Sequence, residues 1–165
     1  VLILPALVLA AICGVACNPT HSDQVAALGD EANGVNEGPT HRPGQPCLVC
    51  HDGAFGDPTA FSVAGTIYET AGSTTPVNGA SIELIDVTGT KYSATSNEAG
   101  NFYVSPSAFT PHYPMTVTVT ASGTKVTMQS LISRNGACAG CHVDPAGPSS
   151  AGRVAMMLED GGTPP

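Results

Sequence analysis

An alternation of Thr, Val and Ile with other residues, from Phe61 to about Leu131, is the feature that most constrains the fold. Alternation over short runs, separated by turn residues, is typical of strands with one buried face. Turn sequences lie at 76–79, 88–89, 98–100 and 122–123. Between them we expect six strands, at 61–69, 80–87, 91–97, 101–105, 115–121 and 125–132. Six short antiparallel strands predict a mainly β fold, a small antiparallel β-sandwich.

The composition agrees with one β domain and excludes two other classes of protein. A chain of 165 residues has the length of one ordinary domain with tails. Its 19 glycines and 14 prolines form a fifth of the chain, against about 12% on average, which excludes a long helical bundle. A net charge of −8 at pH 7 leaves no basic surface to follow a phosphate backbone. Nucleic acid is therefore not an expected partner.

The first seventeen residues, VLILPALVLAAICGVAC, carry no charge and are almost wholly apolar. This run is shorter than the roughly 20 residues of a membrane span and predicts the apolar core of an export signal at 1–17. The small residues 14–16 before Cys17 resemble a bacterial lipobox, although Gly14 stands where that motif usually has Leu. The resemblance implies lipidation of Cys17; the alternative is a buried cysteine in an uncleaved segment. We expect an exported protein, in the periplasm or at the cell surface, held at the outer membrane by this anchor.

Residues 18–46 are polar and poor in large apolar side chains. Such a segment has few apolar side chains whose burial could offset the loss of conformational entropy on folding. It therefore predicts a flexible tether.

Four of the six cysteines form two identical motifs, CLVCH at 47–51 and CAGCH at 138–142. Both match C-x-x-C-H, the attachment motif of c-type haem. Two thiols about one helical turn apart can each add to one vinyl group of a haem that lies on that turn. The next residue then directs its imidazole at the iron. The sequence predicts two covalently attached haem c groups, bound through Cys47, Cys50, Cys138 and Cys141, with His51 and His142 as axial ligands.

Other uses of paired cysteines remain open. Two C-x-x-C pairs can hold one tetrahedral zinc ion, but zinc ribbons usually close a loop of about 15 to 20 residues, and this spacing is far longer. Disulfides in an oxidising compartment, or redox-active thiols, are further alternatives. None of these explains why both pairs are followed by His.

The runs VAGTIY (63–68), PVNGASIELID (76–86) and TSNEAGNFYV (95–104) resemble the carboxypeptidase regulatory-like domain, a transthyretin-like sandwich. This resemblance implies a scaffold or interaction module without catalytic residues. The segment 136–154 resembles the second haem site of small dihaem lipoproteins of bacteria, in which two C-x-x-C-H segments flank such a domain. The expected organisation is a signal peptide and lipobox (1–17), tether (18–46), first haem-binding segment (47–60), β-sandwich (61–131), and second haem-binding segment with tail (132–165).

The second axial ligand of each iron would come from the remaining His and Met side chains. If the six strands reverse direction in turn, both motifs and the loop 106–114 lie at one end of the sandwich. His112 in that loop is then the first candidate on geometry, and His41, six residues before the first motif, is the second. Met156 or Met157 is a weaker candidate for the second haem. Met115 and Met128 share the parity of core positions and are expected to be buried, and His21 is assigned to the tether.

Histidine at both axial positions would give a lower reduction potential than a His/Met pair, because thioether ligation raises it. Closed coordination would also suit electron transfer, since the iron need not bind substrate. The predicted function is electron transfer by a secreted, lipid-anchored dihaem cytochrome, without catalysis. Its partners would be redox proteins and the membrane, with self-association through haems as a further expectation. The alternatives are a haem enzyme or gas sensor with an open sixth position, and a structural or adhesive surface module with zinc or disulfide cysteines.

Overall fold

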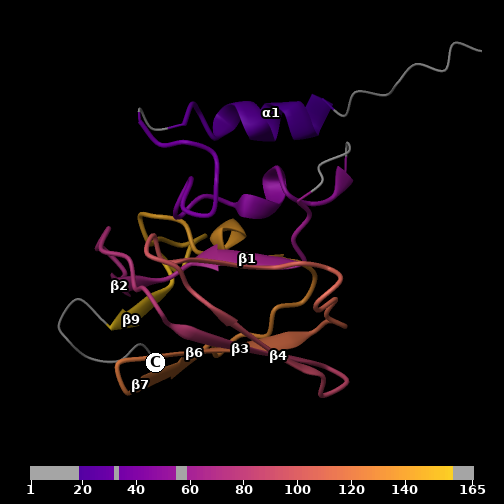
Figure 1. The fold of residues 1–165 in the computed structure, drawn as a ribbon, viewed down its shortest axis with the longest axis vertical. Coiled ribbons are helices and arrows are strands. Elements are labelled where there is room, and N and C mark those ends of the chain that lie inside the picture. The colour runs from indigo at the N-terminus through magenta and orange to yellow at the C-terminus, as the bar shows by residue number, and fades with distance from the viewer. Residues whose placement is uncertain (1–18, 32–33, 55–58, 158–165) are drawn as a thin grey trace, which may run out of the picture.

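The computed structural model describes residues 19–31, 34–54 and 59–157 (Figure 1). The predicted export signal at 1–17 and the predicted lipidation at Cys17 lie outside the described residues. Among the described residues, no helix has the length and apolar character needed to cross a membrane.

The chain is mainly β, and its two larger sheets face each other in a sandwich-like arrangement (Figure 1). The four-stranded sheet is antiparallel and has the order β4-β3-β6-β7. It consists of β3 (Ser81–Asp86), β4 (Lys91–Thr95), β6 (Met115–Ala121) and β7 (Thr124–Thr127). The three-stranded sheet has the order β5-β1-β8, from β1 (Val63–Thr66), β5 (Asn101–Val104) and β8 (Gly136–Ala137). A separate parallel pair joins β2 (Tyr68–Thr70) to β9 (Ala155–Met157).

The core lies between these two sheets and follows the predicted alternation. Ile82 and Leu84 on β3 are fully buried, whereas the residues between them are exposed or half-buried. Phe102 and Val104 on β5 close the core from the other sheet. Met115 is buried there, as expected. This packing confirms the mainly β, antiparallel fold.

Several features of the strands differ from the prediction. The expected strand 125–132 ends at Thr127, and Met128, expected to be buried, is half-buried. The expected strand 61–69 is divided at Ile67, whose N–H donates to Gly100 O and whose carbonyl accepts from Val77 N–H, both at 2.9 Å. The short strands β8 and β9 were not predicted, and each runs parallel to its partner. Parallel pairing over two or three residues leaves almost no local sequence signal.

The segment predicted to be a flexible tether includes a helix and makes hydrogen bonds to the sandwich in its described part. Residues Pro19–Ala27 form helix α1, which lies over the sheet that contains β1 (Figure 1). Further along, Gly44 N–H donates to Thr66 Oγ1 at 2.7 Å, and Asn101 Nδ2 donates to His41 O at 3.0 Å. Hydrogen bonds to strand side chains thus order a segment that lacks the large apolar residues on which the expectation was based.

Candidate functional site

The two C-x-x-C-H motifs adopt the same backbone turn. Each begins as a short 3₁₀ helix, η1 (Cys47–Val49) and η3 (Cys138–Gly140), preceded by a residue at φ −74°, ψ 87° in one case and φ −78°, ψ 93° in the other. In each, the histidine N–H donates to the first cysteine's carbonyl at 2.9 Å. The chain therefore presents two thiols and an imidazole twice in nearly one local geometry.

Within each motif the two thiols differ in exposure. Cys50 and Cys141 are exposed, whereas Cys47 and Cys138 are partly covered. Burial raises the pKa of Cys47 above its ordinary value and, with the nearby Cys47 thiol, raises the pKa of Cys138 to about 12. The Cys138 thiol packs beside Gly65, where an added Cβ would meet Cys138 Cβ at 2.7 Å. The first thiol of each motif is thus held neutral against the sheet.

Strand β1 brings the two motifs together. The strand contacts both η1 and η3, and β8, which leads directly into the second motif, also contacts η1. Residues Leu48 and Val49 of the first motif line one cavity of about 290 Å³ together with Ala137 and Gly140 beside the second. The sequence predicted both motifs at one end of the sandwich; the structure shows them close together beside β1. The parallel pairing of β8 with β1, rather than strand alternation alone, brings the second motif there.

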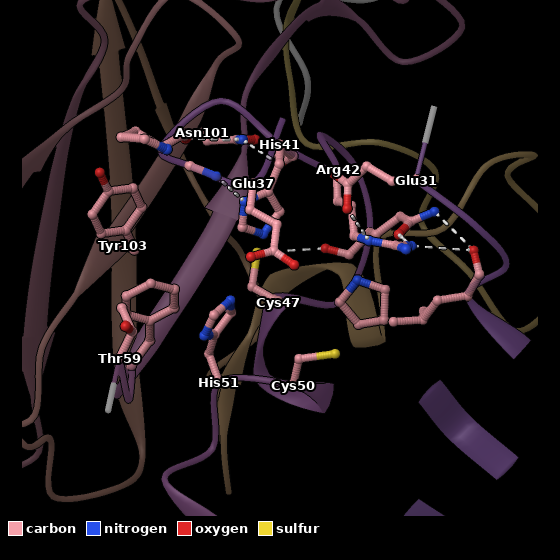
Figure 2. Close-up of a pocket in the computed structure, with 16 residues that line it drawn as sticks. Glu31, Glu37, His41, Arg42, Cys47, Cys50, His51, Thr59, Asn101 and Tyr103 are labelled. Atoms are coloured by element: carbon pink, nitrogen blue, oxygen red, sulfur yellow. Dashed lines mark hydrogen bonds and ion pairs between the residues drawn. The ribbon is translucent and has the colours of Figure 1, made fainter. Parts of the chain in front are cut away.

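The first motif lines a larger cavity of about 630 Å³, in the range of about 300–1,000 Å³ for small-molecule and cofactor sites. Figure 2 shows His41 and His51 in this cavity, between Tyr103 on one side and Arg42 on the other. The ring centroids of His41 and His51 are 5.8 Å apart, with 38° between the planes. Two imidazoles that bind one metal ion from opposite sides, with metal–nitrogen distances near 2 Å, have centroids roughly 6 Å apart. The donor set at this motif fits a haem with two histidine ligands.

The His51 ring begins a row of three aromatic rings. Its centroid lies 4.7 Å from that of Phe61, which in turn stacks on Tyr103 at 4.8 Å with 22° between the planes. Tyr103 points outward from β5, between the buried Phe102 and Val104. The row restricts the orientation of the His51 ring and reaches the surface.

Arg42 organises the chain around the first cavity. Its guanidinium pairs with Glu31 at 3.1 Å and donates to Gln45 Oε1 at 2.8 Å and Gly29 O at 2.9 Å. The residue has φ +48°, a left-handed conformation that is uncommon outside glycine. Such strain persists only where surrounding contacts hold it, and here it lies directly after His41.

The second motif has a different environment, built from the segment that follows it. His142 Nδ1 lies 2.9 Å from Gly152 O. Because a carbonyl only accepts, Nδ1 carries the proton and Nε2 keeps the lone pair that a metal ligand needs. Arg153, the next residue, pairs with Asp144 at 3.0 Å and lies over the Tyr68 ring at 5.1 Å. The second histidine is thus preset as a ligand.

Sequence reasoning missed Gly152, Arg42 and Arg153. The two arginines belong to only five basic residues in an acidic chain, which is the one signal that pointed to them.

The remaining predicted residues are distributed as follows. His112 lies in the loop before β6, with Nδ1 3.3 Å from Oδ2 of Asp86 at the end of β3 and its side chain 74% exposed. Its neighbour Tyr113 packs against the core, as Cys138 does, and burial raises the pKa of its hydroxyl. Met156 is buried in the core, whereas Met157 is exposed. His21, on α1, lines the smaller cavity.

The two carboxylates that follow the motif histidines have local partners. Asp52 accepts from Ala54 N–H at 2.7 Å, and Asp144 pairs with Arg153.

Two findings concern the cysteines and metal donors of the described residues. Cys47, Cys50, Cys138 and Cys141 are free thiols. Within the described ranges, no three His, Cys, Asp or Glu side chains are grouped so that they could hold a metal ion.

Comparison with family models, with curated proteins and with solved structures finds no match for this chain.

Proposed function

We propose that this protein is an exported electron carrier of the c-type cytochrome class, with two covalently attached haem c groups. The observation that supports this most strongly is the repeated turn: two C-x-x-C-H segments with matching backbone geometry and free thiols, brought together on one strand. A haem supplies one-electron chemistry at its iron, and the chain supplies ligands and surroundings. Adjacent motifs suit electron exchange between the two groups.

The proposed roles of the residues follow from their positions. Cys47 and Cys50 hold the first haem and Cys138 and Cys141 the second, through thioether bonds. His51 and His142 are the proximal ligands, and His142 has its tautomer set by Gly152 O. His41 is the second ligand at the first iron, which its position beside His51 supports. His112 remains the candidate for the second iron, as the histidine beside Tyr113, which like Cys138 packs against the core.

The finer assignments of fold and location belong to the same proposal. The β-sandwich is proposed to be a carboxypeptidase regulatory-like domain that serves as a scaffold, flanked by the two haem-binding segments. Lipidation at Cys17 would place the protein at the outer membrane, facing the periplasm or the cell surface. Redox proteins would be its partners, with haem-to-haem self-association between copies.

The test is expression of the chain together with haem-attachment machinery, followed by absorption spectra of oxidised and reduced protein and mass spectrometry. We expect two covalent haems. The paired variants Cys47→Ser/Cys50→Ser and Cys138→Ser/Cys141→Ser should each retain one, and His21→Ala, a histidine outside both motifs, should retain two. Protein without Soret absorbance or added mass would overturn the proposal.

A further inference from the structure

Two histidines in the site region have opposite kinds of hydrogen-bond partner. His142 Nδ1 faces a carbonyl oxygen, that of Gly152, at 2.9 Å. His41 Nδ1 instead accepts the N–H of Gly38 at 3.0 Å. A backbone amide only donates, so the lone pair of the neutral His41 ring lies on Nδ1 and its proton on Nε2. His142 is ready to bind a metal through Nε2, and His41 is not.

Ligation by His41 therefore competes with its bond to Gly38. A neutral imidazole has one nitrogen with a free lone pair, and Gly38 occupies it. If His41 binds a metal through Nε2, its proton must move to Nδ1, and Nδ1 can then no longer accept the Gly38 N–H. If it binds through Nδ1, the metal takes the lone pair that accepts this N–H. Loss of one such hydrogen bond weakens an equilibrium by about two- to tenfold.

The backbone around His41 is fixed, so the competition involves the ring alone. His41 O accepts from Asn101 Nδ2 at 3.0 Å, and Pro39 O accepts from Asn97 Nδ2 at 2.6 Å. These bonds tie the segment to β5 and to the turn before it. The ring can exchange partners by side-chain rotation, without opening the segment.

We propose that His41 is a displaceable sixth ligand of the first haem iron, which gives way to a small π-acceptor ligand, such as carbon monoxide, and returns to the Gly38 N–H. The inference rests on the proposed function. The 5.8 Å between the His41 and His51 rings brings His41 within reach of the iron, and the Gly38 bond provides a resting position when it leaves. The cavity of the first motif is then a binding site for diatomic ligands as well as an electron-transfer site.

The experiment uses the full haem-loaded chain and its His41→Ala variant, with carbon monoxide as the probe. In the wild type we expect a low-spin ferric first haem and carbon monoxide binding in the ferrous state. His41→Ala should make that haem high-spin and increase its affinity for carbon monoxide by about tenfold or more, because the competing state is removed. His21→Ala, at a histidine outside both motifs, is the matched control and should leave the first haem unchanged. The chain with Cys138→Ser/Cys141→Ser isolates the first haem; if it does not fold, electron paramagnetic resonance separates the two haems in the intact protein.

Two results would overturn this inference. Wild-type protein that takes up no carbon monoxide at the first haem, while His41→Ala does, would show a fixed ligand. Unchanged spin state and affinity in His41→Ala would show that His41 does not bind the iron. A chain that carries no covalent haem at all overturns the proposed function itself and is recognised by its missing Soret absorbance.

Discussion

The first and second motifs share one turn but differ in almost everything around it. The first opens into a cavity closed by residues that precede it, including His41 and Arg42. The second is surrounded by residues that follow it, with Gly152 bonded to its histidine and Arg153 paired with Asp144. The five residues of each motif share one turn, whereas the surroundings that would set the axial ligands and the reduction potential of each haem come from other segments. Variants that affect one motif and spare the other test this division.

The largest expected difference concerns the thiols of the protein expressed without haem attachment. Burial raises the pKa of Cys138 to about 12, whereas Cys141 of the same motif is exposed. Because only the thiolate reacts, alkylation of Cys138 should be at least a hundredfold slower than alkylation of Cys141 at pH 8. Mass spectrometry of peptides after timed alkylation measures both rates. Equal rates in the folded protein would show that Cys138 is not buried against β1.

The same shift gives a pH dependence of stability. The pKa of Cys138 is raised on folding, so its contribution is fully present below the unfolded-state value near 9 and is lost as pH rises toward 12. Unfolding midpoints in denaturant should therefore fall above about pH 9. In a Cys138→Ala variant, the unfolding midpoint should fall less steeply above about pH 9, because the titrating thiol is absent.

A feature of the fold or of the candidate site could be predicted from the sequence where neighbouring residues carry its pattern. The alternation in β3 and β6, and the turns between the strands, predicted the sheets because each strand carries its own pattern. The motifs carried the candidate site for the same reason. Arg42 was missed because its partners are backbone carbonyls and polar side chains up to 14 residues away, which no residue pattern encodes. Proximity of His41 to the first motif in sequence did predict its place beside His51, since few residues separate them.

The next largest effect is expected from Gly65→Ala on β1. The added Cβ would lie 2.7 Å from Cys138 Cβ and 3.0 Å from the Phe102 ring, contacts that require the second motif to shift. We expect a loss of about 1–3 kcal/mol in the free energy of unfolding, and lower haem occupancy at the second motif only. Gly140→Ala is the control, since its Cβ would meet Ala137 at an ordinary 3.8 Å. Denaturant unfolding and haem counting by mass provide the two measurements. Equal effects of the two substitutions would argue against close packing of Cys138 on β1.

Removing either arginine sharpens the comparison further. Arg42→Gln removes the hydrogen bonds that order the chain around the first cavity, and Arg153→Gln removes the pairing beside Gly152. Each should cost about 1–2 kcal/mol in the free energy of unfolding. We expect Arg42→Gln to change the spectrum of the first haem and Arg153→Gln that of the second. The exposed Arg134→Gln should change neither. A crossed pattern, in which Arg42→Gln altered the second haem, would contradict the assignment of one arginine to each motif.

The smallest expected effect is a shift in the reduction potential of the second haem when the Gly152 carbonyl oxygen is displaced. Gly152 has φ +76°, and a Cβ there would lie 3.0 Å from Ala146 Cβ, so Gly152→Ala should move the carbonyl that holds His142 Nδ1. The left-handed conformation alone costs an alanine about 1 kcal/mol. Gly123→Ala is the control for the left-handed conformation alone, without a displaced carbonyl. Gly123 has φ +81° in the turn after β6 and nothing within 4 Å of its Cβ position. Both variants should lose similar stability, but only Gly152→Ala should shift the reduction potential of the second haem, since weaker donation by Nδ1–H changes the basicity of the ligand nitrogen. A potential unchanged within error in Gly152→Ala would mean that this carbonyl does not tune the second ligand.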